Sequence, residues 1–294
     1  MKYAQVFPGQ GSQFVGMGKD LFDQYDKAKK YFLQANKILG FKITEIMFEG
    51  NQNELTETNI AQPAIFIHSI IKSKLIKKKG KLIGVAGHSL GEFSALVVSN
   101  SISFQDGLKL VRIRANEMKK ACEMNPGTMA AVIGLGNEVV ENCCMKIKEI
   151  VVPANYNCPG QIVVSGEKNA INNVSKHLIE NGARKVISLN VGGAFHSPLM
   201  LPAKKVLEKY IQKIQFKKPS CLIYQNSVGK GVSSVEEIRK NLVDQLISPV
   251  LWTQSINQMI NDGIKNFVEV GPGRVLQGLI KKINQGVNLE FNPF

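Results

Sequence analysis

The most constraining feature of the sequence is the run Gly-His-Ser-Leu-Gly at residues 87–91. It follows an apolar run typical of a short buried strand and precedes residues that can begin a helix. Gly-x-Ser-x-Gly between a strand and a helix is typical of a nucleophile elbow. The turn is so tight that both glycines must lack side chains, and it exposes Ser89 Oγ where the Leu90 N–H and the helix dipole can stabilise negative charge. Five residues alone also allow a glycine-rich turn with a chance serine.

The composition is that of an ordinary globular enzyme. The 294 residues can bury a substantial core in one large domain or two, and 44% of them are apolar and 20% charged. No apolar run has membrane length and no charged-then-apolar leader is present, so we expect a cytoplasmic protein with no membrane contact. The five cysteines have no metal-like spacing, which favours free thiols and no bound metal.

The net charge of +14 invites the hypothesis of a nucleic-acid partner. Most of the excess is lysine spread along the chain, and the lysine run 77–79 sits in an apparent connector. Because no aromatic-interleaved basic stripe accompanies it, we expect no nucleic-acid partner. Two interpretations remain: a solvated lysine-rich surface, or a basic docking face for an acidic partner or a phosphate-bearing substrate.

The sequence predicts strands and helices along the N-terminal part of the chain, residues 2–122. A β-like run at residues 2–7 ends in Pro-Gly-Gln-Gly-Ser-Gln, whose glycines allow close backbone approach to a ligand. Apolar residues recur at helical spacing over residues 19–39 and 106–122. Residues 51–59 are polar and are expected to form a loop, followed by a helix that starts at 61–63 with its proline in the first turn.

The order of expected strands and helices changes in residues 127–192. Strand, helix, strand, strand, helix and strand are expected in turn at residues 129–135, 137–148, 150–154, 161–165, 168–181 and 184–191. This is the order of the ferredoxin-like unit. Afterwards helices return with isolated strands at 221–225 and 267–270 and a helix at 274–284, and the last residues are expected to form an ordered or frayed tail. We predict an α/β fold: a larger α/β-hydrolase-like domain with a parallel-sheet core (1–126 and 193–294) and an inserted, smaller ferredoxin-like α+β domain (127–192).

A serine nucleophile needs a base, and the chain has four histidines. His68 lies in an apolar helix and His177 in the predicted small-domain helix, while His88 inside the elbow should point away from Ser89 Oγ. His196, in a loop between a strand and a helix, is the remaining candidate. No obvious acid lies between serine and histidine in a triad-like context, so a dyad oriented by a carbonyl and a full triad both remain open.

Four separated motifs occur in order: Phe-Pro-Gly-Gln-Gly-Ser-Gln at 7–13, Gly-His-Ser-Leu-Gly-Glu at 87–92, Gly-Ala-Phe-His-Ser at 193–197 and Glu-Val-Gly-Pro-Gly at 269–273. Together they resemble the malonyl-CoA:acyl-carrier-protein transacylase family, including the acyltransferases of polyketide synthases. The resemblance spans essentially the whole chain. Four motifs in register are far more specific than any one of them.

The resemblance implies a role for each matching position. Ser89 matches the acylated serine, and His196 matches the base that activates it. Gln10 and Leu90 match the residues whose backbone N–H groups form the oxyanion hole. Gln245 matches the glutamine whose carbonyl orients the histidine.

Three further positions concern the acyl group. Arg114 matches the arginine that holds the free malonyl carboxylate, a task that suits a planar guanidinium better than a lysine. The alternative is a surface helix arginine, for which Arg112 is the control because it points elsewhere on the helix. Asn155 lies in the small-domain segment that faces the acyl pocket, and Phe195 matches a phenylalanine that accompanies malonyl selectivity.

The function implied by the resemblance is ping-pong acyl transfer. A malonyl group would pass from malonyl-CoA through Ser89 to the phosphopantetheine thiol of an acidic acyl carrier protein, for fatty-acid or trans-acyltransferase polyketide synthesis. No bound cofactor is expected, and the chain is expected to be a monomer. The rivals are a hydrolase that edits stalled acyl carriers and a non-catalytic docking domain. Arg114 argues against the first, and intact Ser89 and His196 argue against the second.

Overall fold

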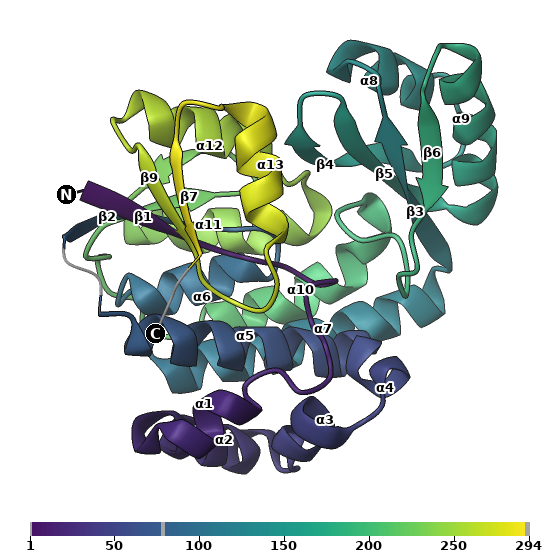
Figure 1. Cartoon of the computed structure of the whole chain (residues 1–294). Helices are drawn as coiled ribbons and strands as arrows, with labels where there is room; N and C mark the ends of the chain where they lie inside the picture. The colour runs from purple at the N-terminus through teal and green to yellow at the C-terminus, as the bar shows by residue number, and fades with distance from the viewer. Residues whose placement is uncertain (1, 78–79, 292–294) are drawn as a thin grey trace.

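The structure, a computed structural model, describes residues 2–77 and 80–291 (Figure 1). The lysine run 77–79 therefore lies largely outside the described residues. The strands are β1 (Lys2–Phe7), β2 (Lys81–Gly87), β3 (Gly127–Ile133), β4 (Val151–Cys158), β5 (Gln161–Glu167), β6 (Lys185–Ser188), β7 (Leu222–Gln225), β8 (Lys230–Val232), β9 (Asn266–Glu269) and β10 (Asn288–Phe291).

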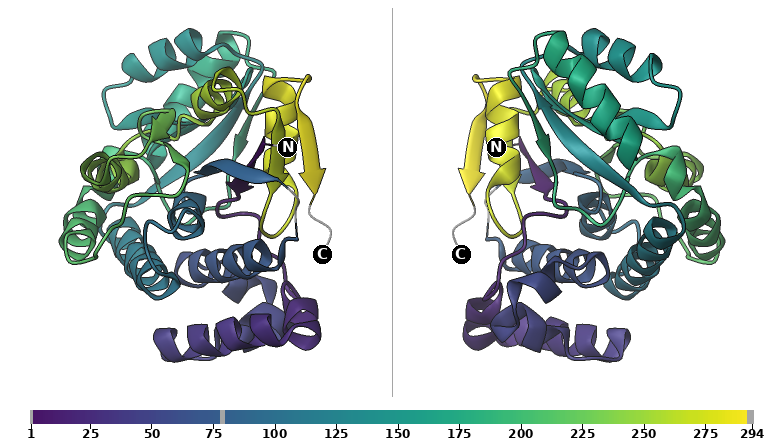
Figure 2. Two further views of the ribbon diagram at one scale, coloured as in Figure 1. Left: turned by 90° about the vertical axis from the view of Figure 1, so that its left-hand side faces the viewer. Right: turned by 90° about the vertical axis from the view of Figure 1, so that its right-hand side faces the viewer.

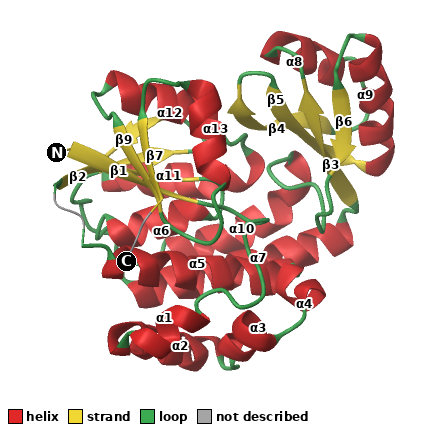
Figure 3. Cartoon of the chain, viewed as in Figure 1, coloured by secondary structure: helices red, strands yellow, loops and turns green. Residues whose placement is uncertain are grey.

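The helices are distributed along the whole chain (Figure 3). They are α1 (Lys19–Gln24), α2 (Asp26–Leu39), α3 (Ile43–Glu49), α4 (Gln52–Thr56), α5 (Thr58–Leu75), α6 (Gly91–Val98), α7 (Phe104–Met124), α8 (Asn137–Met145), α9 (Lys168–Glu180), α10 (Leu201–Ile211), α11 (Val235–Asp244), α12 (Trp252–Asn261) and α13 (Val275–Ile283), with 3₁₀ turns η1 (Pro198–Met200) and η2 (Gln245–Ile247). None of the helices within the described ranges is long and apolar enough to cross a membrane.

The larger sheet has the strand order β10-β9-β1-β2-β7-β8. All its neighbouring strands are parallel except β8, which pairs antiparallel with β7 at the edge. Helices α5, α6 and α7 cover one face and α12 and α13 the other, as a sheet with parallel strands requires (Figure 1). On β1, Tyr3 and Phe7 join the first of these cores while Ala4 and Val6 join the second. The parallel-sheet core expected from the sequence is confirmed.

The smaller sheet is antiparallel, with the order β4-β5-β3-β6. Its strands alternate between two faces: Ala130 and Val132 pack with α8 and α9, whereas Met129 and Ala131 face the core of the larger unit. The two side views show α8 and α9 on the outside of this sheet (Figure 2). The ferredoxin-like order is therefore present within residues 127–192. The domain boundaries at 126 and 193 remain a prediction.

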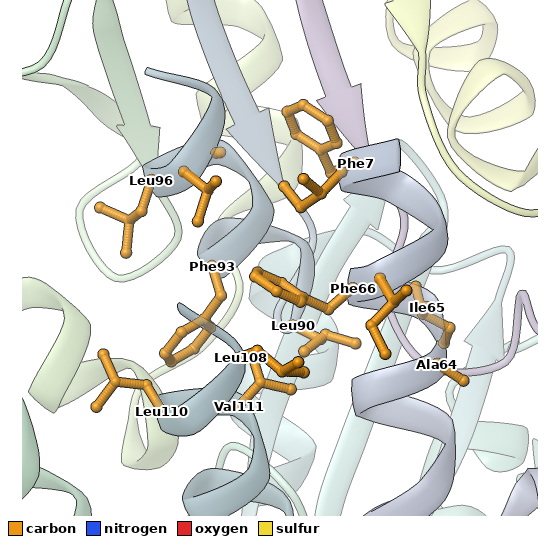
Figure 4. Packing of buried hydrophobic residues seen from close by; sticks show 14 of the residues in the cluster. Phe7, Ala64, Ile65, Phe66, Leu90, Phe93, Leu96, Leu108, Leu110 and Val111 are labelled. Carbon is orange, nitrogen blue, oxygen red and sulfur yellow. The ribbon is translucent and has the colours of Figure 1, made fainter. Parts of the chain in front are cut away.

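Three helices support the turn between β2 and α6. Side chains of α5, α6 and α7 interlock beneath it, including Phe66, Phe93 and Val111 (Figure 4). Gly107 lets α7 approach closely, because a Cβ there would lie 2.8 Å from both the Phe66 ring and Val97. This packing fixes the direction in which α5 and α7 present their polar side chains to the turn.

Three sequence predictions are wrong. Residues 51–59 are not a loop, because Asn51 caps α4 by accepting a hydrogen bond from the Glu54 N–H at 2.8 Å. Helix α5 already begins at Thr58, so Pro63 lies in its interior and not in its first turn. The helix expected at 19–39 is divided at Tyr25, whose extended backbone separates α1 from α2. The tail, expected to be ordered or frayed, contains strand β10, which pairs with β9, and the sequence did not predict β8.

Backbone packs directly on backbone at the elbow. A Cβ on Gly87 would lie 1.8 Å from the Gly91 carbonyl carbon, and a Cβ on Gly91 would lie 2.1 Å from Phe7 O. Neither position can relax by a side-chain rotation, since the obstructing atoms belong to the main chain. The requirement for two glycines that the sequence suggested follows from this contact.

We predict that Gly91→Ala destabilises the fold by about 3 kcal/mol, since β1 or α6 must move to admit the methyl group. The measurement is the free energy of unfolding in denaturant. Gly278→Ala on exposed α13 is the matched control: its Cβ meets nothing within 4 Å, and the change should stabilise by up to about 1 kcal/mol. Equal stability of the Gly91 variant and the unmodified protein would contradict the packing argument.

Candidate active site

Ser89 occupies a strained position at the elbow. Its φ of 50° lies in the left-handed region, where such conformations persist only if their surroundings impose them. Asn226, just beyond β7, imposes it: its Oδ1 accepts a hydrogen bond from the Ser89 N–H at 2.7 Å, and its Nδ2 donates to Gly87 O at 2.7 Å. The hydroxyl is thereby held at the N-terminal end of α6.

His196 lies beside this hydroxyl. Its Nε2 is 2.7 Å from Ser89 Oγ, and its Nδ1 is 2.9 Å from Gln245 O and 3.2 Å from Ser248 O. Two carbonyl acceptors require the proton on Nδ1, which leaves Nε2 to accept the serine proton. Of the two alternatives left open by the sequence, the geometry forms the dyad oriented by carbonyls.

The surroundings keep His196 neutral. Burial, together with the nearby charge of Arg114, lowers its pKa to about 3, although the hydrogen bonds to the carbonyls of Gln245 and Ser248 act in the opposite direction. At neutral pH the imidazole is therefore a free base that can take the Ser89 proton.

Arg114 is a buried cation, with 1% of its surface exposed. One guanidinium nitrogen donates to Gln62 Oε1 at 2.7 Å, and the other donates to Ser89 Oγ at 3.0 Å and Gln245 Oε1 at 3.1 Å. Burial lowers its pKa to about 10, so it stays charged at neutral pH. Arg112 is exposed and donates to Ile38 O, so the two arginines point in different directions, as the sequence predicts.

Gln245, on η2, links these groups. Its side-chain Nε2 donates to Ser89 O at 3.0 Å, while its Oε1 accepts from Arg114 and its main-chain carbonyl accepts from His196. One residue thus fixes the positions of the serine, the histidine and the arginine relative to one another.

Two backbone donors face the same space. Gln10 and Leu90 line the cavity at Ser89, and neither backbone N–H has a hydrogen-bond partner among the described residues. The loop that carries Gln10 lies against the elbow, because a Cβ on Gly9 would be 2.7 Å from His88 O. This arrangement can hold an oxyanion that forms at a carbonyl attacked by Ser89.

The cavity at Ser89 has a volume of about 150 Å³. Its apolar wall includes Met118, Met129 and Phe195. Asn155, from β4, also lines it, and its Oδ1 is buried without a hydrogen-bond partner in the described structure.

A second cavity of about 290 Å³ leads away from the first. The two share wall residues such as Gln10 and Asn155, and the second continues between β5 and α13, past Val163 and Leu279. The hollow therefore runs from Ser89 along the junction of the two sheets. An extended substrate arm can reach the serine along this path.

Sequence reasoning missed three residues of the site. Gln62 holds Arg114, Asn226 holds the elbow, and Glu92 accepts hydrogen bonds from Gln225 Nε2 at 3.0 Å and from the Asn226 N–H at 2.8 Å. A signal existed for Asn226, since it directly follows a predicted strand and such strand ends meet at one edge of a parallel sheet. Gln62 offered no comparable signal.

The other three histidines are accounted for elsewhere. His88 points away from the serine, with Nε2 2.9 Å from Asn157 Oδ1. His68 is buried on α5, and burial lowers its pKa to about 3. His177 is exposed beside Glu180. Within residues 2–77 and 80–291, no three His, Cys, Asp or Glu side chains gather closely enough to hold a metal ion.

An α/β fold with an elbow serine, a neutral histidine and unpaired N–H donors defines an enzyme that forms acyl-serine intermediates. The acyl transferase domain family matches residues 4–288. The malonyl CoA-acyl carrier protein transacylase of Bacillus subtilis (strain 168) is 41% identical over 288 residues, which cover 97% of this chain and 91% of that protein.

Solved structures indicate the same family. An acyl carrier protein S-malonyltransferase from Vibrio cholerae superposes with a TM-score of 0.96 at 35% identity, covering 100% of this chain and 98% of its own. A malonyl-transacylase solved in complex with a type II polyketide synthase acyl carrier protein superposes with a TM-score of 0.96 at 35% identity. The match covers 100% of this chain and 97% of that chain. The chain belongs to the acyl transferase family, in the group of the malonyl-CoA:acyl-carrier-protein transacylases.

We predict that acylation of Ser89 by acetyl-CoA keeps its rate from about pH 8 to about pH 5. The active form of His196 is the unprotonated one, so a pKa lowered from 6.5 to about 3 extends activity toward acid. Acyl-enzyme formation is followed by rapid quenching and intact-protein mass spectrometry. A rate that halves near pH 6.5, the ordinary value for histidine, would contradict the assignment.

The same measurement tests the electrostatic cause. Arg114→Met removes the neighbouring cation, so the pKa of His196 rises and the acidic fall in rate moves to higher pH. Arg112→Met, which removes an exposed arginine from the same helix, should leave the profile unchanged.

Proposed function

We propose that this protein transfers a malonyl group from malonyl-CoA to the phosphopantetheine thiol of an acyl carrier protein, through a malonyl ester on Ser89. The observation that carries the proposal is Arg114: a buried guanidinium 3.0 Å from Ser89 Oγ in a small cavity. Its Nε–H is buried and has no partner in the described structure. An acyl group with a terminal carboxylate satisfies both that donor and the charge.

In the first half-reaction, His196 Nε2 takes the hydroxyl proton and Ser89 Oγ attacks the thioester carbonyl carbon. The oxyanion is held by the backbone N–H groups of Gln10 and Leu90. When the carbon–sulfur bond breaks, the proton on His196 passes to the departing CoA sulfur. The products are the malonyl ester on Ser89 and free CoA.

The second half-reaction reverses these roles. The thiol of the carrier's phosphopantetheine gives its proton to His196, and the sulfur attacks the ester carbonyl carbon. Ser89 leaves and recovers the proton, so the enzyme returns to its starting state. No bound cofactor takes part in either half. The hollow that runs from Ser89 between β5 and α13 offers a route for the phosphopantetheine arm.

The cavity walls support selectivity for a small acyl group. Met118, Met129 and Phe195 enclose the cavity of about 150 Å³, so an α-methyl branch would meet their side chains. One such group changes the transition-state energy by only about 1–3 kcal/mol. Asn155, from β4, contributes to the wall from the small-domain side.

An acidic carrier suits the chain's net charge of +14, which favours rapid association with a negatively charged partner. We propose that the carrier belongs to fatty-acid or polyketide synthesis. The monomeric state and the cytoplasmic location expected from the sequence remain predictions. An editing hydrolase is less well supported, because an enzyme that removes stalled acyl groups has little use for a carboxylate clamp at Arg114.

We predict that malonyl-CoA leaves a malonyl adduct on Ser89 that a phosphopantetheinylated carrier removes quickly and water removes slowly. The measurement is intact-protein and peptide mass spectrometry before and after addition of carrier. Ser89→Ala abolishes the adduct with the fold retained, whereas Ser94→Ala, on the same helix, keeps it. An adduct that water removes as fast as the carrier does would favour the editing hydrolase.

We predict that Arg114→Ala lowers kcat/KM for malonyl transfer by more than about a hundredfold, since the substrate carboxylate loses a partner worth about 3 kcal/mol or more. Acetyl transfer should fall much less, because acetyl carries no carboxylate and loses only the support that Arg114 gives to Ser89 and Gln245. Arg112→Ala is the matched control and should affect neither. Equal losses with both acyl groups would show that Arg114 supports the fold and does not bind the carboxylate.

A further inference from the structure

Glu92, on the first turn of α6, is a carboxylate with 0% of its surface exposed. Its Oε1 accepts from Gln225 Nε2 at 3.0 Å, and its Oε2 accepts from the Asn226 N–H at 2.8 Å. Burial raises the pKa of Glu92, and these two donors, Gln245 and the charge of Arg114 offset part of that effect. Because both oxygens face N–H donors, the surroundings fit the ionised carboxylate and not a protonated one.

Arg114 needs such a charge nearby. Its hydrogen-bond acceptors are the side chains of Gln62, Ser89 and Gln245, which are all neutral. The charge that raises its pKa, against the effect of burial, is that of Glu92. A buried cation without a compensating anion is strongly unfavourable. Hydrogen bonds connect the two groups through Asn226 and Ser89, so Glu92 is a buried carboxylate in the same network as Arg114.

Glu92 also reaches the nucleophile through a short chain of hydrogen bonds. Its carboxylate fixes the Asn226 main chain, and the Asn226 side chain fixes the Ser89 N–H. A change at Glu92 therefore has two separable effects: one on the geometry of the elbow, which every acyl group feels, and one on the charge around Arg114, which only a charged acyl group feels.

We propose that Glu92 is the resident counter-ion of Arg114 and that its charge limits how tightly the site holds a malonyl carboxylate. This makes Glu92 a specificity-determining residue, and the inference rests on the proposed function of Arg114 as the clamp. Arg114 and Glu92 give the site one cation and one anion. A bound malonyl group adds a second anion, and its repulsion by Glu92 keeps the acyl-enzyme from becoming too stable to react with the carrier.

The test compares malonyl-CoA with acetyl-CoA in Glu92→Gln, which keeps the shape of the side chain and removes its charge. The ratio of kcat/KM for malonyl over acetyl should rise about tenfold, the size expected for one unit charge near the site at protein-like screening. The KM for malonyl-CoA should fall. Both absolute rates should drop, because the introduced amide places an N–H group against one of the donors at Gln225 and Asn226.

Two variants separate charge from geometry. Gln225→Met removes one hydrogen bond to Glu92 and keeps the carboxylate, so the rates should fall while the malonyl-to-acetyl ratio stays constant. Glu92→Asp keeps the charge on a shorter side chain and should behave in the same way. If Glu92→Gln also leaves the ratio unchanged, Glu92 only braces the elbow and the inference is overturned.

The outcome with Arg114→Ala distinguishes this failure from a failure of the proposed function. Selective loss of malonyl transfer in Arg114→Ala together with an unchanged ratio in Glu92→Gln rejects the counter-ion and keeps the clamp. Equal loss of both acyl groups in Arg114→Ala rejects the clamp itself.

A stability measurement covers the case in which Glu92→Gln does not fold. The double variant Arg114→Met with Glu92→Gln removes both buried charges and should fold with a higher Tm than either single variant, since each single change leaves one charge unpaired. A double variant no more stable than the single ones would show that the two charges are not a pair, and would overturn the inference.

Discussion

A single buried positive charge determines the arrangement of this site. Arg114 leaves α7 beneath the elbow and is held by side chains from three separate segments: Gln62 on α5, the elbow serine, and Gln245 on η2. These segments are far apart in the chain and meet only because α5, α6 and α7 pack tightly under the sheet. Since a buried guanidinium must have acceptors on several sides, the packing of the helices and the geometry of the nucleophile cannot change independently.

The elbow and the parallel core were predictable because local sequence specifies them. A tight strand-to-helix turn needs glycine at both ends, and the backbone contact of Gly91 with Phe7 O shows why. The dyad was also within reach, since few histidines competed for the role of base. The start of α5 was not predictable from the sequence. The polar residues that precede Thr58 are typical of a loop, although they cap and begin helices. The domain boundaries remain predictions, and so do the roles of the site residues.

What the sequence could not supply is the set of partners brought together by the fold. Gln62 has no motif around it, and its function follows only from lying 2.7 Å from a guanidinium that folding buries. Asn226 and Glu92 lie at positions that the sequence marks, one after a predicted strand and the other in the elbow motif. Their partners are still hidden, because neither the bond of Asn226 to the strained Ser89 backbone nor that of Glu92 to Asn226 is visible in local spacing. Residues that act through long-range hydrogen bonds to the main chain carry no periodic signal, so a structure is needed to find them.

The clamp and the base are electrostatically coupled. The charge of Arg114 helps burial to lower the pKa of His196, so the residue proposed to hold the acyl carboxylate also keeps the imidazole unprotonated. In the proposed reaction a malonyl carboxylate paired with Arg114 offsets part of that charge, and the pKa of His196 then rises. A stronger base is useful at that stage, because the malonyl ester is already formed and His196 must next accept the proton of the carrier's thiol. An uncharged acyl group does not offset the charge of Arg114, which then has only Glu92 as a compensating anion. The pKa of His196 therefore does not rise, and the histidine does not become a stronger base. The same cation can therefore contribute to selectivity twice, once in binding the carboxylate and once in setting the basicity of His196 for the second transfer.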